Sequence, residues 1–331
     1  MIKETRKVQR TGKSTLIVSL PKRWATENEI ENGSILFVSQ KQNGDLFLSP
    51  EISEQDQTAK LEIGEKSGET LVRDVISFYI DGYRTIEITS NRLSAMQKRD
   101  IHSIVNKLIG PEIIEESSSK VVIQDLLSPE ELLPDRVLKR MKNMTRSMIQ
   151  DALSTIIKQN NELAYDVMQR DDDIDRLNLL MARQFTEILK SSSISQEPIN
   201  PITVFHFMQA ASNLERMADY AAKIAEISTQ IDYDQSPVAI EKIPEIISMY
   251  SNLIDESISI ILNADNIRAN QLLDRTLELK RQLSIMVGLS GKMDDGMRIR
   301  LLVSDSFERI LDRINNIAEL SINLHIALLE N

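Results

Sequence analysis

Several residue types that commonly carry chemistry are scarce or missing in this chain. Its 331 residues include no cysteine, three histidines and one tryptophan, and aromatic residues make up 4%. Without cysteine there is no disulfide framework and no thiolate metal site, so any metal must be bound by carboxylate or imidazole groups. No apolar run reaches the ~18 residues of a transmembrane helix, and the N-terminus lacks the apolar stretch of a signal peptide. We therefore expect a cytoplasmic protein without membrane insertion.

The scarcity of histidine also argues against catalysis. His102, His206 and His325 leave few nucleophile–base pairs, and none of them follows an acidic residue by three positions, the spacing found in carboxylate-bridged oxidases. The sequence also contains no glycine loop of the kind that holds phosphates. We expect a protein that is not an enzyme, with metal-dependent hydrolysis by a carboxylate site as a remote alternative.

The charge of the chain is unevenly distributed. Hydrophobic residues make up 41% and charged residues 27%, which is typical of soluble globular domains, and the length allows two or three of them. The first 50 residues hold eight basic and five acidic residues, a net of +3, so the remainder carries −14 (−11 − 3). This pattern predicts a small basic module joined to a larger acidic one; the alternative is a basic face that only contacts water.

The N-terminal module is expected to consist of short strands. Residues 14–20 and 34–39 are apolar and β-branched, and Asn43-Gly44 favours a tight turn into a strand at 45–48. Thr11-Gly12 favours another turn, and residues 24–30 a short helix. Four short strands and one helical turn provide too little core for a stable monomer, so pairing with a second copy is expected.

Three stretches of this module carry a family resemblance: Arg6-Lys-Val-Gln-Arg-Thr-Gly-Lys-Ser-Thr, Val18-Ser-Leu-Pro-Lys-Arg-Trp and Glu31-Asn-Gly-Ser-Ile-Leu. They resemble the swapped-hairpin AbrB/SpoVT family, which forms intertwined dimers whose basic strands and loops can bind DNA. The resemblance implies that residues 1–51 form a dimerisation and DNA-binding domain. The phosphate contacts that it implies are Lys7, Arg10, Lys13, Lys22 and Arg23. The alternative is a domain that only dimerises.

Residues 60–127 have the alternating strands and helices of a small α+β domain with its helices on one face. The expected strands cover residues 60–63, 85–89, 112–116 and 121–124, and the expected helices 70–81 and 94–108. Thr70 has a side chain suited to cap the first helix, and Gly82 ends it.

From residue 135 onward the sequence has helical periodicity and contains an internal repeat. The segment 215–226 recurs as 308–319 at a constant offset of 93 residues (308 − 215). Such a repeat in a helical region indicates a duplicated unit. We expect six helices in two three-helix bundles, residues 135–230 and 236–331.

The repeat contains acidic pairs at i and i+4, which lie on the same side of a helix. The pairs are Glu215/Asp219 and Glu308/Asp312, and the preceding helix adds Asp171/Asp175. Carboxylate pairs from adjacent helices form an oxygen-rich site of the kind used by di-metal bundles, although one such pair alone is more often a solvated face. Oxygen ligands favour Mg, Mn, Ca or Fe over Zn.

A second family resemblance rests on Val167-Met-Gln-Arg-Asp-Asp-Asp-Ile-Asp-Arg-Leu and on both copies of the Glu-Arg-x-x-Asp motif. These segments are similar to the PhoU family, whose two tandem three-helix bundles hold metal ions on Glu/Asp-x-x-x-Asp pairs. That family regulates phosphate uptake together with phosphate transporters and sensor kinases. The whole chain resembles the archaeal PhoU-type regulators, which implies a dimeric, metal-binding regulator of phosphate homeostasis that can also act on transcription. The alternative is a signalling adaptor that contacts a transporter ATPase or a sensor kinase without binding DNA.

The second bundle departs from the PhoU pattern. Aligned by apolar residues, Thr276 and Lys280 stand at the positions of the acidic pair 171/175, and a protonated lysine cannot bind metal. Glu278 could partly substitute, but we expect this bundle to bind fewer ions. The candidate metal ligands are Asp171, Asp175, Glu215 and Asp219 in the first bundle, and Glu278, Glu308 and Asp312 in the second.

Overall fold

We analysed a computed structural model of the chain. It describes residues 4–40, 44, 46–50, 58–127, 132–190, 200–231, 243–286 and 295–329. The described residues fall into two compact units, with the second beginning at Thr58. Among the helices of these ranges, none is long and apolar enough to cross a membrane.

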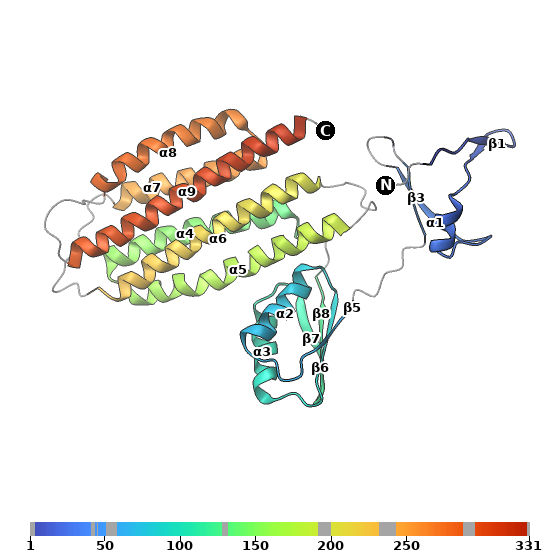
Figure 1. Cartoon of the computed structure of the whole chain (residues 1–331). Helices are drawn as coiled ribbons and strands as arrows, with labels where there is room; N and C mark the ends of the chain where they lie inside the picture. The colour runs from blue at the N-terminus through green and yellow to red at the C-terminus, as the bar shows by residue number, and fades with distance from the viewer. Residues whose placement is uncertain are drawn as a thin grey trace. The chain divides into compact units, whose positions relative to one another are not determined.

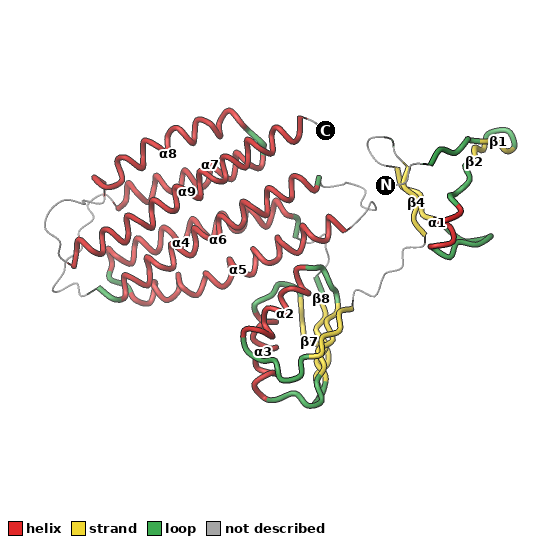
Figure 2. Tube along the Cα trace, viewed as in Figure 1, coloured by secondary structure: helices red, strands yellow, loops and turns green. Residues whose placement is uncertain are grey.

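The first unit consists of two hairpins and a short helix, as the sequence predicts. Its elements are β1 (Gln9–Thr11), β2 (Thr15–Ile17), α1 (Lys22–Glu27), β3 (Leu36–Gln40) and β4 (Leu46–Pro50). β1 pairs antiparallel with β2, and β3 with β4 (Figure 2). Leu16, Ile35 and Val38 are 62%, 74% and 61% exposed. No hydrophobic side chain described in this unit is buried, so these hairpins do not form a core of their own.

The second unit begins with a four-stranded sheet and two helices. Its elements are β5 (Thr58–Glu62), α2 (Glu69–Ile80), β6 (Thr85–Thr89), α3 (Ala95–Asn106), β7 (Pro111–Glu116) and β8 (Lys120–Asp125). The strand order is β5-β6-β8-β7, with β5 parallel to β6 and the other neighbours antiparallel. Both helices cover one face of the sheet (Figure 1), where Val75, Ile88, Ile101 and Ile123 form the core. This is the expected α+β arrangement.

The start of α2 differs from the expectation that Thr70 caps it. The helix already begins at Glu69, and the N-cap residue is Gly68 at φ 60°, a conformation that glycine adopts without strain. The Gly68 amide donates a 2.6 Å hydrogen bond to Asp100 Oδ2 on α3. A side chain from another helix therefore satisfies the amide at the start of this helix, which local sequence does not reveal.

Six long helices follow and form two three-helix bundles. They are α4 (Pro134–Lys158), α5 (Asn161–Lys190), α6 (Pro201–Thr229), α7 (Ile243–Leu262), α8 (Asn266–Met286) and α9 (Asp295–Leu329). One apolar core runs through both bundles and includes Met148, Met217, Ile254 and Phe307. The expected multidomain class, a small β region followed by helical bundles, is confirmed.

The internal repeat extends beyond the motif that the sequence analysis found. Arg170 Nη2 of α5 lies 2.7 Å from Asp151 Oδ2 of α4, and Arg275 of α8 pairs in the same way with Glu256 of α7. The arginine and its acidic partner each lie 105 positions later in the second copy (275 − 170 and 256 − 151). The duplicated unit is therefore a whole bundle, with an offset of 105 in its first two helices and 93 in its third.

Contacts between α4 and α7 relate the two copies by an approximate twofold axis. Arg146 Nη1 is 2.7 Å from Asp255 Oδ2, and Gln150 Nε2 donates to Ser251 Oγ at 2.9 Å. With the offset of 105, position 146 corresponds to 251 and position 150 to 255. Each contact therefore joins the first position of one copy to the second position of the other, as twofold symmetry requires.

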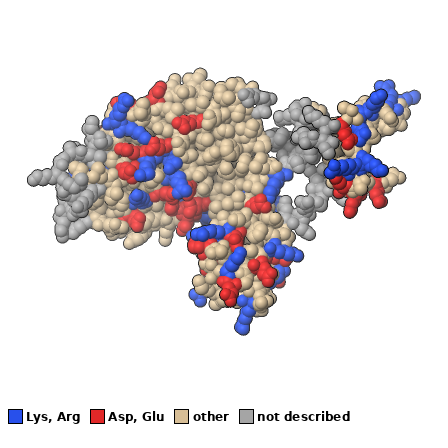
Figure 3. Space-filling view, viewed as in Figure 1, with Lys and Arg blue, Asp and Glu red and all other residues tan. Residues whose placement is uncertain are grey.

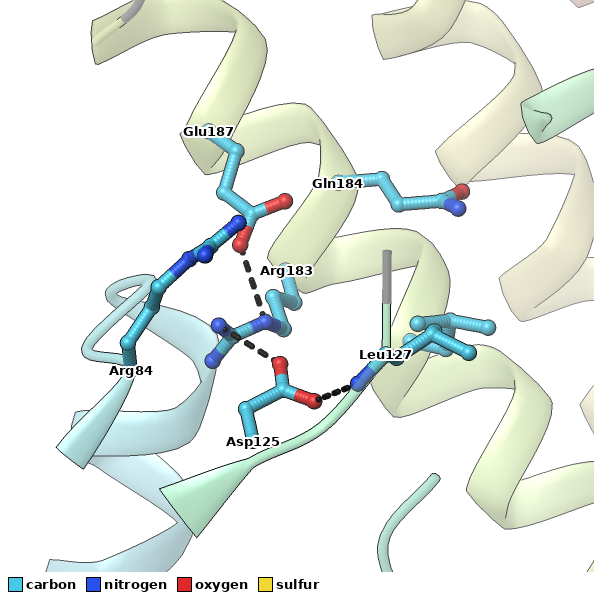
Figure 4. Close-up of a pocket in the computed structure, with 7 residues that line it drawn as sticks. Arg84, Asp125, Leu127, Arg183, Gln184 and Glu187 are labelled. Carbon is cyan, nitrogen blue, oxygen red and sulfur yellow. Dashed lines mark hydrogen bonds and ion pairs between the residues drawn. The ribbon is translucent and has the colours of Figure 1, made fainter. Parts of the chain in front are cut away.

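A buried arginine joins the sheet to α5 (Figure 4). Arg183, whose side chain is 3% exposed, lies 2.8 Å from Asp125 of β8 and 2.9 Å from Glu187 of α5. Its Nη1 also donates to the carbonyls of Tyr79 and Tyr83. Burial raises the pKa of Glu187, while the Arg183 charge opposes that rise. The adjoining cavity measures about 20 Å³, enough for one water molecule, so this junction is packed and fully paired around the guanidinium.

Candidate functional site

The structure brings the two acidic pairs of the first bundle together at the seam between α5 and α6. Asp171 and Asp175 lie one turn apart on α5, and Glu215 and Asp219 one turn apart on α6. Each pair borders the buried stripe of its helix, because Ile174 and its apolar equivalents on α6 turn inward to the core. The charged side chains of this face gather in one band across the helices (Figure 3). The sequence prediction that these carboxylates face each other is consistent with this placement.

Among the described residues, two oxygens of this cluster have no hydrogen-bond partner, although Arg216 Nε lies 3.4 Å from one of them, Glu215 Oε2. They are Asp171 Oδ1 and Glu215 Oε2, both buried. The Glu215 side chain is only 14% exposed and that of Asp219 35%. Buried carboxylate oxygens are normally satisfied by a donor, a proton or a metal ion. The cluster therefore has free acceptor capacity of the type that a hard cation uses.

The carboxylates also disfavour each other's ionisation. Burial raises the pKa of Asp171 to about 7, and the charges of Asp219 and Asp175 add to the rise. Burial, followed by the charge of Asp219, raises the pKa of Glu215 to about 7. The pKa of Asp175 is raised by the same two causes. Such mutual repulsion is relieved by protonation or by a bound cation.

Two basic side chains compensate this charge only in part. Arg216 Nη1 is 3.1 Å from Asp219 and its Nε is 3.4 Å from Glu215. The Arg216 side chain is 56% exposed, so water screens these contacts. Lys107, from the segment after α3, lies 3.9 Å from Asp172 and lowers the pKa of Asp175 against the other influences. The cluster remains electrostatically unsatisfied despite these neighbours.

The four carboxylates fit a metal ion by their chemistry, although they do not form a closed ligand set. Across the described ranges, no three acidic or histidine side chains stand close enough to hold one ion. The two unpartnered oxygens belong to different helices, so an ion bound by both would join α5 to α6. If an ion binds here, the residues that would hold it are the two i,i+4 pairs of α5 and α6.

The second bundle contains a lysine in the equivalent place. Lys280 of α8 forms an ion pair with Asp312 of α9. Thr276, fully buried one turn earlier, hydrogen-bonds to Asn315 of α9. Both α8 side chains therefore face α9, as the acidic pair of α5 faces α6, which agrees with the alignment made from apolar residues. Glu308 is exposed on α9. Lys280 already neutralises Asp312, the other acidic residue of the pair.

The structure does not bring Glu278 to this place. It precedes Lys280 by two positions, which is about 200° around a helix, so the two side chains leave α8 on opposite sides. Glu278 accepts a 2.8 Å hydrogen bond from Gln282, lies 3.4 Å from Arg281 and lines a groove of about 370 Å³ beside α7. It therefore does not compensate for the missing acidic pair beside Asp312.

The candidate DNA contacts are placed on the first unit and are all exposed. They are Lys7, Arg10, Lys13, Lys22 and Arg23. Arg10 belongs to β1, Lys13 to the turn before β2, and Lys22 begins α1. The Arg23 side chain is 73% exposed and pairs with Glu27 within the same helix. The positions are thus accessible to a phosphate backbone.

The architecture defines a class of protein: a small basic hairpin unit followed by an α+β domain and a duplicated three-helix bundle with an acidic cluster. Comparison with known families agrees with this class. Residues 138–228 match the PhoU domain, and residues 9–56 match the antidote-toxin recognition domain of the bacterial antitoxin MazE. The first bundle is therefore similar to the PhoU domain, and the predicted resemblances are confirmed.

Relatives with curated names are similar over the helical region. A PhoU homolog of the phosphate-specific transport system from Clostridium acetobutylicum is 36% identical over 86 residues, 26% of this chain and 37% of the relative. One from Zymomonas mobilis is 25% identical over 191 residues, 54% of this chain and 78% of the relative. The chain thus spans about a third of the first relative and most of the second.

A solved structure supports the fold. The phosphate transport system regulatory protein PhoU from Streptococcus pneumoniae superposes with a TM-score of 0.50 at 19% identity. The superposition covers 60% of this chain and 95% of the other. The shared architecture is that of the helical bundles.

Proposed function

We propose that this protein is an accessory regulator of phosphate transport. The observation that carries the proposal is the acidic cluster of α5 and α6, which lies within the matched PhoU domain. The named relatives are accessory proteins of phosphate-specific transport systems. By their analogy, the protein's partner is a phosphate transporter ATPase or a phosphate-sensing kinase. Deletion of its gene should change phosphate uptake, and unchanged uptake at limiting and excess phosphate would contradict the proposal.

We further propose that Asp171, Asp175, Glu215 and Asp219 bind one or more Mg, Mn, Ca or Fe ions. The orphaned oxygens and the raised pKa values support this assignment, because a cation would satisfy both. Such an ion supplies no catalytic step in this proposal: it neutralises the cluster and ties α5 to α6. In the second bundle a metal ion bound by Glu308 and Asp312 would have to displace Lys280 from Asp312. Glu278 points elsewhere, so fewer ions bind there.

Elemental analysis of protein purified without chelator tests the metal assignment. The double variant Glu215→Gln/Asp219→Asn should lose most of the bound metal. The matched variant Glu308→Gln/Asp312→Asn removes the equivalent acids of the second bundle and should lose little. Equal metal content in all three proteins would show that these acids form only a solvated face.

The first unit is proposed to form a homodimer. Its apolar strand residues are exposed in the single chain, and a second copy of the same hairpins would cover them. Sedimentation should give a dimer for the full chain and a smaller species for a chain that begins at Thr58. A full-length monomer at micromolar concentration would refute this assembly.

Binding of DNA by this unit is proposed as a second role. The accessible basic positions support it, and affinity should fall steeply with salt because phosphate contacts release counterions. Mobility shifts on promoters of the organism's phosphate genes should weaken in Arg10→Ala/Lys13→Ala but not in Lys66→Ala/Arg73→Ala, which removes equal charge from the α+β domain. If the first variant binds like the parent, or nothing binds at low salt, the adaptor alternative is favoured.

A further inference from the structure

One arginine of the second bundle is partly buried and has no counter-charge. Arg313 of α9 is half-buried, and its Nε is buried without a hydrogen-bond partner. Within the described ranges it takes part in no hydrogen bond or ion pair. Burying one N–H group of a guanidinium without a partner is unfavourable, so such a group points to a ligand that completes it.

The register of α6 against α9 places this arginine next to two others. Asn316 donates to Asn213 at 3.1 Å, and the Tyr220 hydroxyl lies close enough to Arg309 to raise the pKa of its guanidinium. Between these contacts α6 advances seven residues (220 − 213) while α9 goes back seven (316 − 309), so the helices run antiparallel. The same register sets Arg216 opposite Arg313.

The approximate twofold axis between the bundles gives the same result. With the offset of 93, Arg216 corresponds to Arg309, and Tyr220 to Arg313. The observed contact between Tyr220 and Arg309 therefore has Arg216 beside Arg313 as its symmetry counterpart. Both arguments start from the proximity of Tyr220 and Arg309, and both place the three arginines and the Tyr220 phenol along one seam.

Three acidic side chains beside the seam have cationic partners, and Glu215 shares Arg216 with one of them. Asp219 pairs with Arg216, Asp305 lies 3.0 Å from Arg309, and Asp312 pairs with Lys280. None of these carboxylates forms an ion pair with Arg313. Among the described residues, Arg313 is therefore the cation of this seam without an ion pair, with the exposed side chains of Arg216 and Arg309 on either side.

We propose that this seam binds a tetrahedral phosphate group, either inorganic phosphate or a phosphate monoester. Guanidinium groups donate paired N–H bonds that match the oxygens of phosphate, and the Tyr220 hydroxyl adds a further donor. A phosphate group bound by Arg313, Arg216 and Arg309 contacts both bundles, so its binding stabilises their packing. This site adjoins the carboxylates proposed to hold metal, because Arg216 also contacts Glu215 and Asp219, but it uses none of them as a ligand.

Titration calorimetry on chelator-treated full-length protein tests the site with inorganic phosphate as the probe. Arg313→Gln should weaken binding by roughly 10-fold to 100-fold, the usual effect of losing a charge-assisted contact. Arg313→Lys keeps the positive charge but loses the paired N–H donors of the guanidinium, so its phosphate affinity should lie between those of the parent and Arg313→Gln. Arg300→Gln is the matched control, since Arg300 is a half-buried arginine of the same helix whose Nε also lacks a partner, but it lies more than two turns from the seam.

Parallel titrations with phosphoserine and with chloride complete the experiment. Tighter binding of phosphoserine assigns the site to a phosphate monoester, and tighter binding of phosphate assigns it to the free ion. Either result supports the proposal when only the Arg313 variants are affected. The proposal is overturned if neither phosphate compound binds at millimolar concentration, or if Arg313→Gln binds like Arg300→Gln. Because metal is removed throughout, a failure of the metal assignment leaves this measurement interpretable.

Discussion

The two bundles carry the same acidic motif on their third helices but face it with opposite charges. In the first bundle α5 presents Asp171 and Asp175 to Asp219, and the pKa of both α5 acids is raised. In the second bundle α8 presents Thr276 and Lys280, and the lysine pairs with Asp312. In the second bundle Lys280 therefore neutralises Asp312, whereas the acidic cluster of the first bundle keeps excess negative charge. The two copies pack in the same way, but they differ at two positions that face the motif. Asp171 and Asp175 of the first copy are Thr276 and Lys280 in the second, so only the first copy keeps four acidic side chains together.

The largest expected effect is a cation-dependent rise in stability that belongs to the first bundle. Adding a divalent ion to chelated protein at pH 8 should raise the melting temperature by roughly 5–10 °C at a hundredfold excess over its Kd. The reason is that the ion binds only the folded carboxylate cluster. Calorimetric scans should show this rise in Glu308→Gln/Asp312→Asn but not in Glu215→Gln/Asp219→Asn. The opposite pattern would assign the site to the second bundle.

Reversing one charge should make the second bundle resemble the first. Lys280→Asp places a third carboxylate beside Asp312 and Glu308, where the lysine now forms an ion pair. Without metal this variant should melt below the parent, because like charges then repel. With metal it should regain stability and hold additional ions by elemental analysis. Lys280→Met serves as the control, since it removes the lysine without adding a ligand and should gain no metal.

The pH dependence of metal-free protein should follow the raised pKa values of the first bundle. The folded pKa of Asp171 and of Glu215 is about 7, whereas the unfolded values are about 4. The folded state therefore holds more protons, so this contribution is complete below about pH 4 and is lost as the pH rises through 7. Melting temperatures between pH 5 and 8 should decline less in Asp171→Asn than in the parent. The control Glu278→Gln removes an exposed carboxylate and should decline as the parent does. If Asp171→Asn also declined as the parent does, the cluster would be solvated and the prediction wrong.

The smallest expected difference concerns the duplicated ion pair between the first two helices of each bundle. The Arg170 side chain is 22% exposed and bonds to Asp151 and Ser147, whereas that of Arg275 is 53% exposed. Arg170→Met should cost about 1–3 kcal/mol of unfolding free energy, and Arg275→Met about 0–1 kcal/mol. Urea denaturation measures both. Equal costs would mean that burial does not distinguish the two pairs.

Much of this molecule follows from patterns that are local in the sequence. Apolar, β-branched runs and turn residues predicted the strands of the first unit, and the helical period predicted α4 to α9. The i,i+4 spacing placed Glu215 and Asp219 on one side of a helix, and the repeat indicated two bundles. The alignment through apolar residues also matched Lys280 to Asp175, which the facing of α8 and α9 now supports. These inferences hold because side-chain direction within one helix is fixed by its 3.6-residue period.

Other features depend on which elements pack together, and no local pattern encodes that. The sequence proposed Glu278 as a ligand, but the packing of α8 turned it toward α7. No local pattern distinguishes Arg183 from other helical arginines, yet the sheet buries it against Asp125.

The sequence by itself determined the elements, the duplication and the acidic pairs, because each depends on spacing within a single segment. Only the tertiary structure decided that α6 and α9 run antiparallel, that Arg313 has no partner among the described residues, and that Lys280 reaches Asp312. Burial and electrostatic coupling depend on distances between segments that lie far apart in the chain. Those distances are set by the packing of whole helices around one core.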